Sequence, residues 1–192
     1  MAKAISEALY LQSKSTALHS YKAIYLKIFL TALTILSRFI HLHVILIFLA
    51  INVFLLLYVG AKRILATVFA LWCMLTSAII LLDMIFTTLT IDVILNLVYG
   101  FTTFTSIIFF YVTTPPTQIR KFVGFNAVSL TYLFFGYSVK LVADLIDTVK
   151  ARGWVYSYNP IKYRYLLRAF TVLLISRISE IVDALRARGV EE

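Results

Sequence analysis

Long apolar runs constrain this chain more than any other feature of its sequence. The longest covers residues 23–59, with a polar break around Arg38, and two more cover residues 64–82 and 91–112. Of the 192 residues, 61% are apolar and 14% are charged. A soluble globule of this size buries only about 60–70% of its surface, too little to hide so much apolar area. Because every backbone polar group must be paired inside a bilayer, we predict an all-α integral membrane protein.

Helix length divides the longest run into two membrane spans. One helix over residues 23–59 would be about 55 Å long at ~1.5 Å per residue, whereas the hydrocarbon core is ~30 Å thick. We therefore expect two spans joined near Arg38. Residues 64–82, ended by Asp83, and residues 91–112 supply the other two. The predicted fold has about four transmembrane helices over residues 23–112, preceded by an amphipathic segment over residues 1–22.

Residues 113–192 form a different helical region. Its Thr-Thr-Pro-Pro start, residues 113–116, predicts a helix break followed by a new helix, because proline is favoured in a first helical turn. Residues 122–142 are apolar, and we expect a long helix lying along or partly in the membrane, with Lys140 and Asp144 as an i,i+4 pair. Pro160 then opens a last amphipathic helix with an apolar stripe at spacings of three and four.

The basic residues predict the topology. The formal net charge is +9, and lysine and arginine concentrate on the cytoplasmic side of membrane proteins. With both termini cytoplasmic and four crossings, 17 of the 18 basic residues lie inside and Arg38 alone lies outside. A fifth full span over residues 122–142 would export eight basic residues, which the same bias disfavours. We expect a multi-pass protein of the cell membrane. Nucleic acid is not an expected partner, because the charge is spread along hydrophobic helices.

The residues indicate no catalytic, metal or cofactor site. The chain lacks the phosphate-binding loop motif, so ATP binding by that route is excluded. His41 and His43 lack a third nearby ligand, and the single cysteine, Cys73, cannot form an intrachain disulfide. Asp83 and Asp92 could mark an ion path, but both fall at predicted span ends that water reaches. We therefore predict a chain without enzymatic activity of its own.

A repeated tripeptide is the most informative motif. Ala-Arg-Gly occurs twice, 36 residues apart, and each copy closes a predicted amphipathic helix. Glycine after a helix is a common cap, and arginine in the last turn suits the helix dipole. Two arginines at helix tips could equally insert into carboxylate-lined grooves of partner proteins, because a guanidinium bonds a carboxylate through two parallel hydrogen bonds. The copies are Ala151, Arg152 and Gly153, and Ala187, Arg188 and Gly189.

The order of these features resembles the transmembrane T component of energy-coupling factor (ECF) transporters, most clearly over residues 91–189. In that family the two motifs end coupling helices whose arginines, here Arg152 and Arg188, dock into two ABC-type ATPase subunits. The resemblance implies a coupling-helix region over residues 113–192 and a separate membrane subunit that captures a vitamin or a transition-metal ion. Many members carry a further span after the second motif, and this sequence stops at Glu192, so it resembles a short variant.

Other classes of protein remain as alternatives. An integral-membrane enzyme would need clustered carboxylates or histidines near the membrane surface. The acids Asp144, Asp147, Glu180 and Asp183 instead alternate with basic residues at helical spacing, which is typical of solvated pairs. A substrate-capture subunit would need converging polar groups in the outer half of the bundle, and few are present. A stand-alone membrane scaffold is a further alternative.

Overall fold

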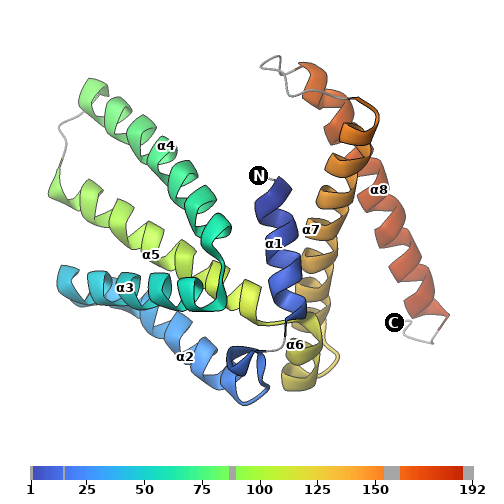
Figure 1. Cartoon of the computed structure of the whole chain (residues 1–192), viewed down its shortest axis with the longest axis horizontal. Coiled ribbons are helices and arrows are strands. Elements are labelled where there is room, and N and C mark those ends of the chain that lie inside the picture. Colours follow the sequence, from blue (N-terminus) through green and yellow to red (C-terminus); the bar gives the residue numbers. More distant parts are fainter. Residues whose placement is uncertain (1, 15, 87–89, 154–160, 188–192) are drawn as a thin grey trace. The chain divides into compact units, whose positions relative to one another are not determined.

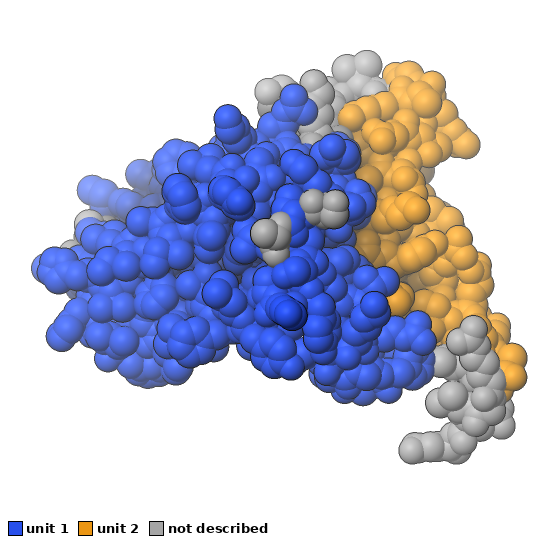
Figure 2. Space-filling model, turned by 60° about the horizontal axis from the view of Figure 1, so that its bottom comes forward, with its two compact units in different colours: residues 1, 3–132 blue, residues 2, 133–192 orange. Residues whose placement is uncertain are grey.

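The computed structural model describes residues 2–14, 16–86, 90–153 and 161–187, and all regular secondary structure in these ranges is helical. The chain divides into two compact units, unit 1 with residues 1 and 3–132 and unit 2 with residue 2 and residues 133–192, coloured blue and orange in Figure 2. The helices are α1 Ala2–Ser13, η1 Ala17–His19, α2 Ala23–Leu36, η2 Ser37–Phe39, α3 Leu42–Val59, α4 Lys62–Phe86, α5 Ile91–Thr113, α6 Pro116–Val123, α7 Ala127–Ala151 and α8 Ile161–Arg186.

Four of the described helices, α3, α4, α5 and α7, are long and apolar enough to cross a membrane. This confirms the all-helical class predicted from the sequence and agrees with a membrane-embedded chain. The four helices are not the predicted four, however, because α2 has only 14 residues, about 21 Å of helix. It tightens into the 3₁₀ turn η2 after Leu36, and the hydroxyl of Ser37 donates to the carbonyl of Thr34, at 2.6 Å.

In unit 1, α5 is the central helix, and α2 and α3 lie alongside it (Figure 1). The hydroxyl of Tyr99 donates to the carbonyl of Ile35 at the far end of α2, at 2.9 Å. Helix α4 leaves α3 through a turn at Gly60, which has a φ of +94° that favours glycine. Farther along, α4 contacts α5 through Trp72, whose ring is stacked on that of Phe104 with centroids 6.1 Å apart.

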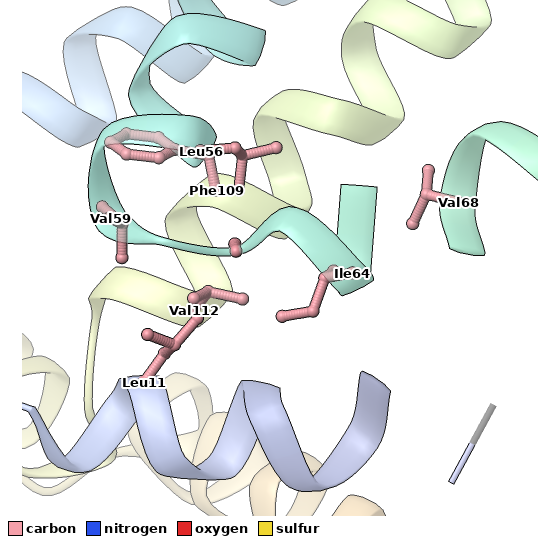
Figure 3. Packing of buried hydrophobic residues seen from close by; sticks show 8 residues of the cluster. Leu11, Leu56, Val59, Ile64, Val68, Phe109 and Val112 are labelled. Carbon is pink, nitrogen blue, oxygen red and sulfur yellow. The ribbon is translucent and has the colours of Figure 1, made fainter. Parts of the chain in front are cut away.

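A buried apolar cluster holds one end of unit 1 together (Figure 3). In it, Leu11 of α1 meets Val112 of α5, and Phe109 of α5 lies against Leu56 of α3. Burying side chains of this size contributes about 1.5–3 kcal/mol each when they are fully removed from water. The cluster therefore fixes α1 against the ends of three longer helices. Its members are Leu11, Leu56, Val59, Ala61, Ile64, Val68, Phe109 and Val112.

Small polar side chains line the contacts of α5 with α2 and α3. The hydroxyls of Thr102 and Thr105 donate to the carbonyls of Val98 and Phe101 in the preceding turn of α5. Their hydrogen-bonding needs are thus met inside the helix, and their small size lets helices approach closely, as in other membrane bundles. The fully buried members of this set are Thr34, Asn52, Thr102, Thr105 and Ser106.

The region after α5 differs from the single long helix predicted over residues 122–142. Helix α6 ends at Val123, and Gly124, with a φ of +80°, turns the chain. Helix α7 then begins with a reciprocal cap, in which the Ser129 N–H donates to Asn126 Oδ1 at 3.0 Å and the Asn126 N–H donates to Ser129 Oγ at 3.1 Å. The prediction missed this boundary because Asn126 and Ser129 lie inside an apolar stretch. Helix α4 continues three residues beyond Asp83, where the membrane span is predicted to end, and reaches Phe86.

Candidate functional site

The first Ala-Arg-Gly motif forms the end of α7. Ala151 is the last helical residue, and the Arg152 N–H donates to the Thr148 carbonyl at 3.2 Å. Gly153 has a φ of +78°, and its N–H donates to the Lys150 carbonyl at 2.9 Å. This left-handed residue stops the helix, as glycine does at many helix ends. The predicted helix end is confirmed, and Arg152 is an exposed residue at the tip.

The second motif begins directly after α8. Helix α8 ends at Arg186, and the Ala187 N–H donates to the Asp183 carbonyl at 2.9 Å, which continues the helical hydrogen-bond pattern by one residue. This agrees with a helix that closes at the motif. Arg188 and Gly189, the other two predicted site residues, lie outside the described residues. Of the two arginines predicted at helix ends, only Arg152 is among the described residues.

A groove of about 400 Å³ runs beside the first tip, within unit 2. Its apolar lining comes from one stripe of α7, which includes Leu141, Leu145 and Val149, and from Ala169 and Leu173 of α8. Its polar lining extends from Tyr137 to Arg152, which follows Tyr137 by fifteen positions, or about 22 Å at helical rise. The groove therefore follows about four turns of helix, with polar and apolar side chains along its length. Its polar and charged lining residues are Tyr137, Lys140, Asp144, Thr148, Arg152 and Arg177.

Only some of the charged residues around this groove form ion pairs. Arg177 pairs with Glu180, and this hydrogen bond holds the pKa of the guanidinium above its ordinary value. Lys150 pairs with Asp147 at 3.8 Å. The predicted pair of Lys140 with Asp144 is not formed, and Lys140 makes no ion pair with any described residue. Helical spacing brought these two side chains within range, but it does not determine their rotamers.

Other candidate residues lie apart from one another. His41 and His43 are exposed around the start of α3, and Cys73 is a free, exposed cysteine of α4. Asp92 is exposed in the first turn of α5. Within the described part of the chain, no three side chains of His, Cys, Asp or Glu gather where a metal ion could be held.

The structure also reveals a buried lysine whose role the sequence did not indicate. Lys27 is fully buried in unit 1, and its ammonium donates to the Thr113 carbonyl at 2.7 Å and to Thr114 Oγ1 at 3.0 Å. It thereby ties the start of α2 to the break between α5 and α6. The only sequence signal was a lysine inside an apolar run, and its acceptors lie 86 and 87 residues away.

Basic residues gather at this same end of unit 1. The N–H of Arg63 donates to Glu7 Oε1 at 3.3 Å, which brings the start of α4 next to α1. The apolar cluster described above joins α1 to the ends of α3 and α5. We call the region around Lys27, Lys62 and Arg63 the basic end of unit 1. Arg38 belongs to η2, at the opposite tip of the hairpin formed by α2 and α3.

Comparison with known proteins adds no assignment to this geometry. The functional interpretation therefore depends on the residues themselves, above all on the arginine at the tip of α7. No protein-family model, no curated protein and no solved structure matches the chain.

Proposed function

We propose that this chain is the transmembrane coupling subunit of an ECF-type ABC importer. It transmits the movement of two ATPase subunits to a membrane subunit that captures a vitamin or a transition-metal ion. The observation that carries the proposal is the tip of α7, where a left-handed Gly153 ends the helix and leaves Arg152 exposed. The end of α8 at Arg186, directly before a second Ala-Arg-Gly, supports it.

The proposed mechanism is mechanical. Each ATPase grips one tip, Arg152 or Arg188, through a carboxylate that accepts two hydrogen bonds from the guanidinium. When the ATPases close on ATP, the two tips move relative to one another. Helices α7 and α8 transmit this movement to the apolar surface that faces the capture subunit. That subunit then tilts and releases its cargo inward, so the coupling chain itself performs no chemistry.

The test compares the two tip arginines with two arginines of α8 that lie away from its end. Losing a favourable charge at a helix end costs only about 0.3–1 kcal/mol. Losing one member of a buried, hydrogen-bonded charge pair costs about 2–5 kcal/mol, some 30- to 5000-fold in affinity. We therefore expect Arg152→Ala and Arg188→Ala to leave the chain folded in the membrane and to weaken its co-purification with the ATPases. The double variant is expected to abolish uptake of the cargo.

Arg164→Ala and Arg168→Ala are the charge-matched controls, since both arginines are exposed on α8 away from its end. They are expected to retain ATPase binding and uptake. Equal losses of ATPase binding in the tip variants and the control variants would show that general positive charge, not the motif, binds the partner. Normal ATPase binding and uptake in the double tip variant would overturn the proposal.

A further inference from the structure

Two cationic side chains, Lys140 and Arg177, line the groove between α7 and α8 together with Tyr137, and one of them, Arg177, lies over the Tyr137 ring. The Arg177 guanidinium carbon lies 5.4 Å from the centroid of the Tyr137 ring. Lys140 follows Tyr137 by one helical turn, so the two side chains share a face of α7. All three residues line the groove. Side chains from two helices thus converge on one small polar region.

The charges of this region are only partly balanced. Arg177 forms an ion pair with Glu180, whereas Lys140 has no ion-pair partner among the residues that the structure describes. Asp144 lines the groove one turn farther along α7 and carries a negative charge. The residues that line the whole groove include three positive side chains, Lys140, Arg152 and Arg177, and one negative side chain, Asp144, so the lining carries a net positive charge. A single negative charge complements it, whereas a triphosphate would bring several charges close to Asp144 and Glu180.

The composition of α7 changes at the same point. Its first 13 residues, Ala127–Val139, include no charged residue, and Lys140 is the first charge of the helix. A helix of this kind lies with its uncharged half among acyl chains and its first lysine at the level of the headgroups. Tyrosine is likewise favoured at that level. By this composition Lys140, and Arg177 beside Tyr137, are expected at the level of the lipid phosphates.

We propose that this end of the groove binds the headgroup phosphate of a monoanionic phospholipid such as phosphatidylglycerol. Lys140 and Arg177 bind the phosphodiester oxygens, and a guanidinium fits them through paired hydrogen bonds. The acyl chains run along the uncharged half of α7. The groove of about 400 Å³ falls within the ~300–1,000 Å³ of small-molecule sites, so the rest of the headgroup has room beside Asp144.

The experiment measures lipid binding to the full-length chain. The protein is purified in detergent, stripped of lipid, and titrated with phosphatidylglycerol, phosphatidylcholine or inorganic phosphate, and bound species are counted by native mass spectrometry. A basic residue near anionic lipid is worth about 1 kcal/mol, or about fivefold in affinity. We expect Lys140→Gln and Arg177→Gln each to weaken phosphatidylglycerol binding about fivefold. Asp144→Asn is expected to strengthen it by a similar factor, because it removes a repulsive charge.

Arg164→Gln and Arg168→Gln are the controls, since these exposed arginines do not line the groove. They are expected to bind phosphatidylglycerol as the unaltered chain does. Equal losses in groove and control variants, or equal binding of phosphatidylglycerol and phosphatidylcholine, would overturn the proposal. Full displacement of the lipid by millimolar inorganic phosphate would also overturn it, because the site would then hold a free anion. The altered residues exclude Arg152, so the result is independent of ATPase docking.

Discussion

Lys27 places its ammonium group in the interior of unit 1, where Thr113 and Thr114 accept its hydrogen bonds. A buried charge is costly unless hydrogen bonds compensate it. The Thr113 carbonyl also needs a donor, since α5 ends there and the last carbonyls of a helix have no partner within it. The hydrogen bond between Lys27 and the Thr113 carbonyl therefore compensates the buried charge and also pairs a carbonyl that the helix end leaves free.

Replacing Lys27 tests this mutual dependence. Hydrogen bonds to charged groups contribute about 1.5–3 kcal/mol. Lys27→Met keeps the length of the side chain but leaves the Thr113 carbonyl without its donor, so we expect the melting temperature in detergent to fall by about 3–12 °C. Lys22→Met, at an exposed position just before α2, is the matched control and is expected to change little. An unchanged melting temperature for Lys27→Met would show that the carbonyl has another donor.

His19 makes the stability of this end depend on pH. Its Nδ1 lies 2.7 Å from Thr16 Oγ1, and its backbone carbonyl accepts a hydrogen bond from Gln118. Burial is the main cause that lowers the pKa of His19 below 6.5, and the nearby positive charges of Lys27 and Lys14 lower it further. The backbone carbonyls of Val112 and Leu11 oppose this shift.

The sign of the pH dependence follows from the lowered pKa. The unfolded chain binds a proton at His19 more readily than the folded chain, so stability rises with pH in this range. The contribution of His19 is fully present above pH 6.5 and is lost as the pH falls through 6.5 toward the folded-state pKa. We expect His19→Gln to flatten the slope of melting temperature against pH between about pH 7.5 and 5. His43→Gln, at an exposed position, is expected to retain the slope of the unaltered chain, and an unchanged slope in His19→Gln would contradict the assignment.

Helix boundaries show how much of the fold could be predicted from the sequence. Breaks marked by local chemistry were predicted correctly, namely the Pro115-Pro116 start of α6 and the Gly153 end of α7. The Asn126 cap was missed because a long apolar run masks it. Interactions between distant residues could not be predicted, since Tyr99 and Ile35 are 64 positions apart and no periodicity connects them.

The candidate site was predicted to a similar extent. The position of Arg152 at a helix end follows from the glycine after it, which is a local signal. The groove beside it requires two helices, so no single stretch of sequence reveals that Lys140 and Arg177 share it. Helical spacing also predicted a Lys140–Asp144 pair that does not form, because spacing brings side chains near one another without deciding which contact each makes.

Helices α4 and α5 pack closely at Gly100, because glycine has no side chain. A Cβ added at Gly100 would lie 3.0 Å from Cη2 and 3.1 Å from Cζ2 of Trp72. Gly100→Leu must therefore displace the indole ring, and overpacking of this kind costs about 1–3 kcal/mol. In a Trp154→Phe background we expect the fluorescence of Trp72 to change and the melting temperature to fall. Ala70→Leu, on an exposed part of α4, is expected to leave both unchanged, and a Gly100→Leu variant with native fluorescence would contradict this packing.

The distribution of basic residues supports the predicted membrane topology of the whole chain. The basic end of unit 1 gathers Lys27, Lys62 and Arg63 on one side of the bundle, and Arg38 lies at the other tip of the α2–α3 hairpin. This agrees with a hairpin whose tip faces outward, because basic residues concentrate on the cytoplasmic side. Helix α7 is the least apolar of the four candidate spans. A full crossing by α7 would also export the eight basic residues that follow Lys140.

Cysteine labelling in intact cells tests this arrangement. The native Cys73 is first replaced by alanine, and single cysteines are introduced as Phe39→Cys and Glu192→Cys. Phe39 is 84% exposed at the hairpin tip, so we expect a membrane-impermeant thiol reagent to label it in intact cells. The cysteine at position 192 is expected to react only after permeabilisation, since export of eight basic residues opposes the positive-inside bias. Ready labelling at position 192 in intact cells would show that α7 crosses the membrane fully, and this would contradict the proposed binding of Arg152 and Arg188 to cytoplasmic ATPases.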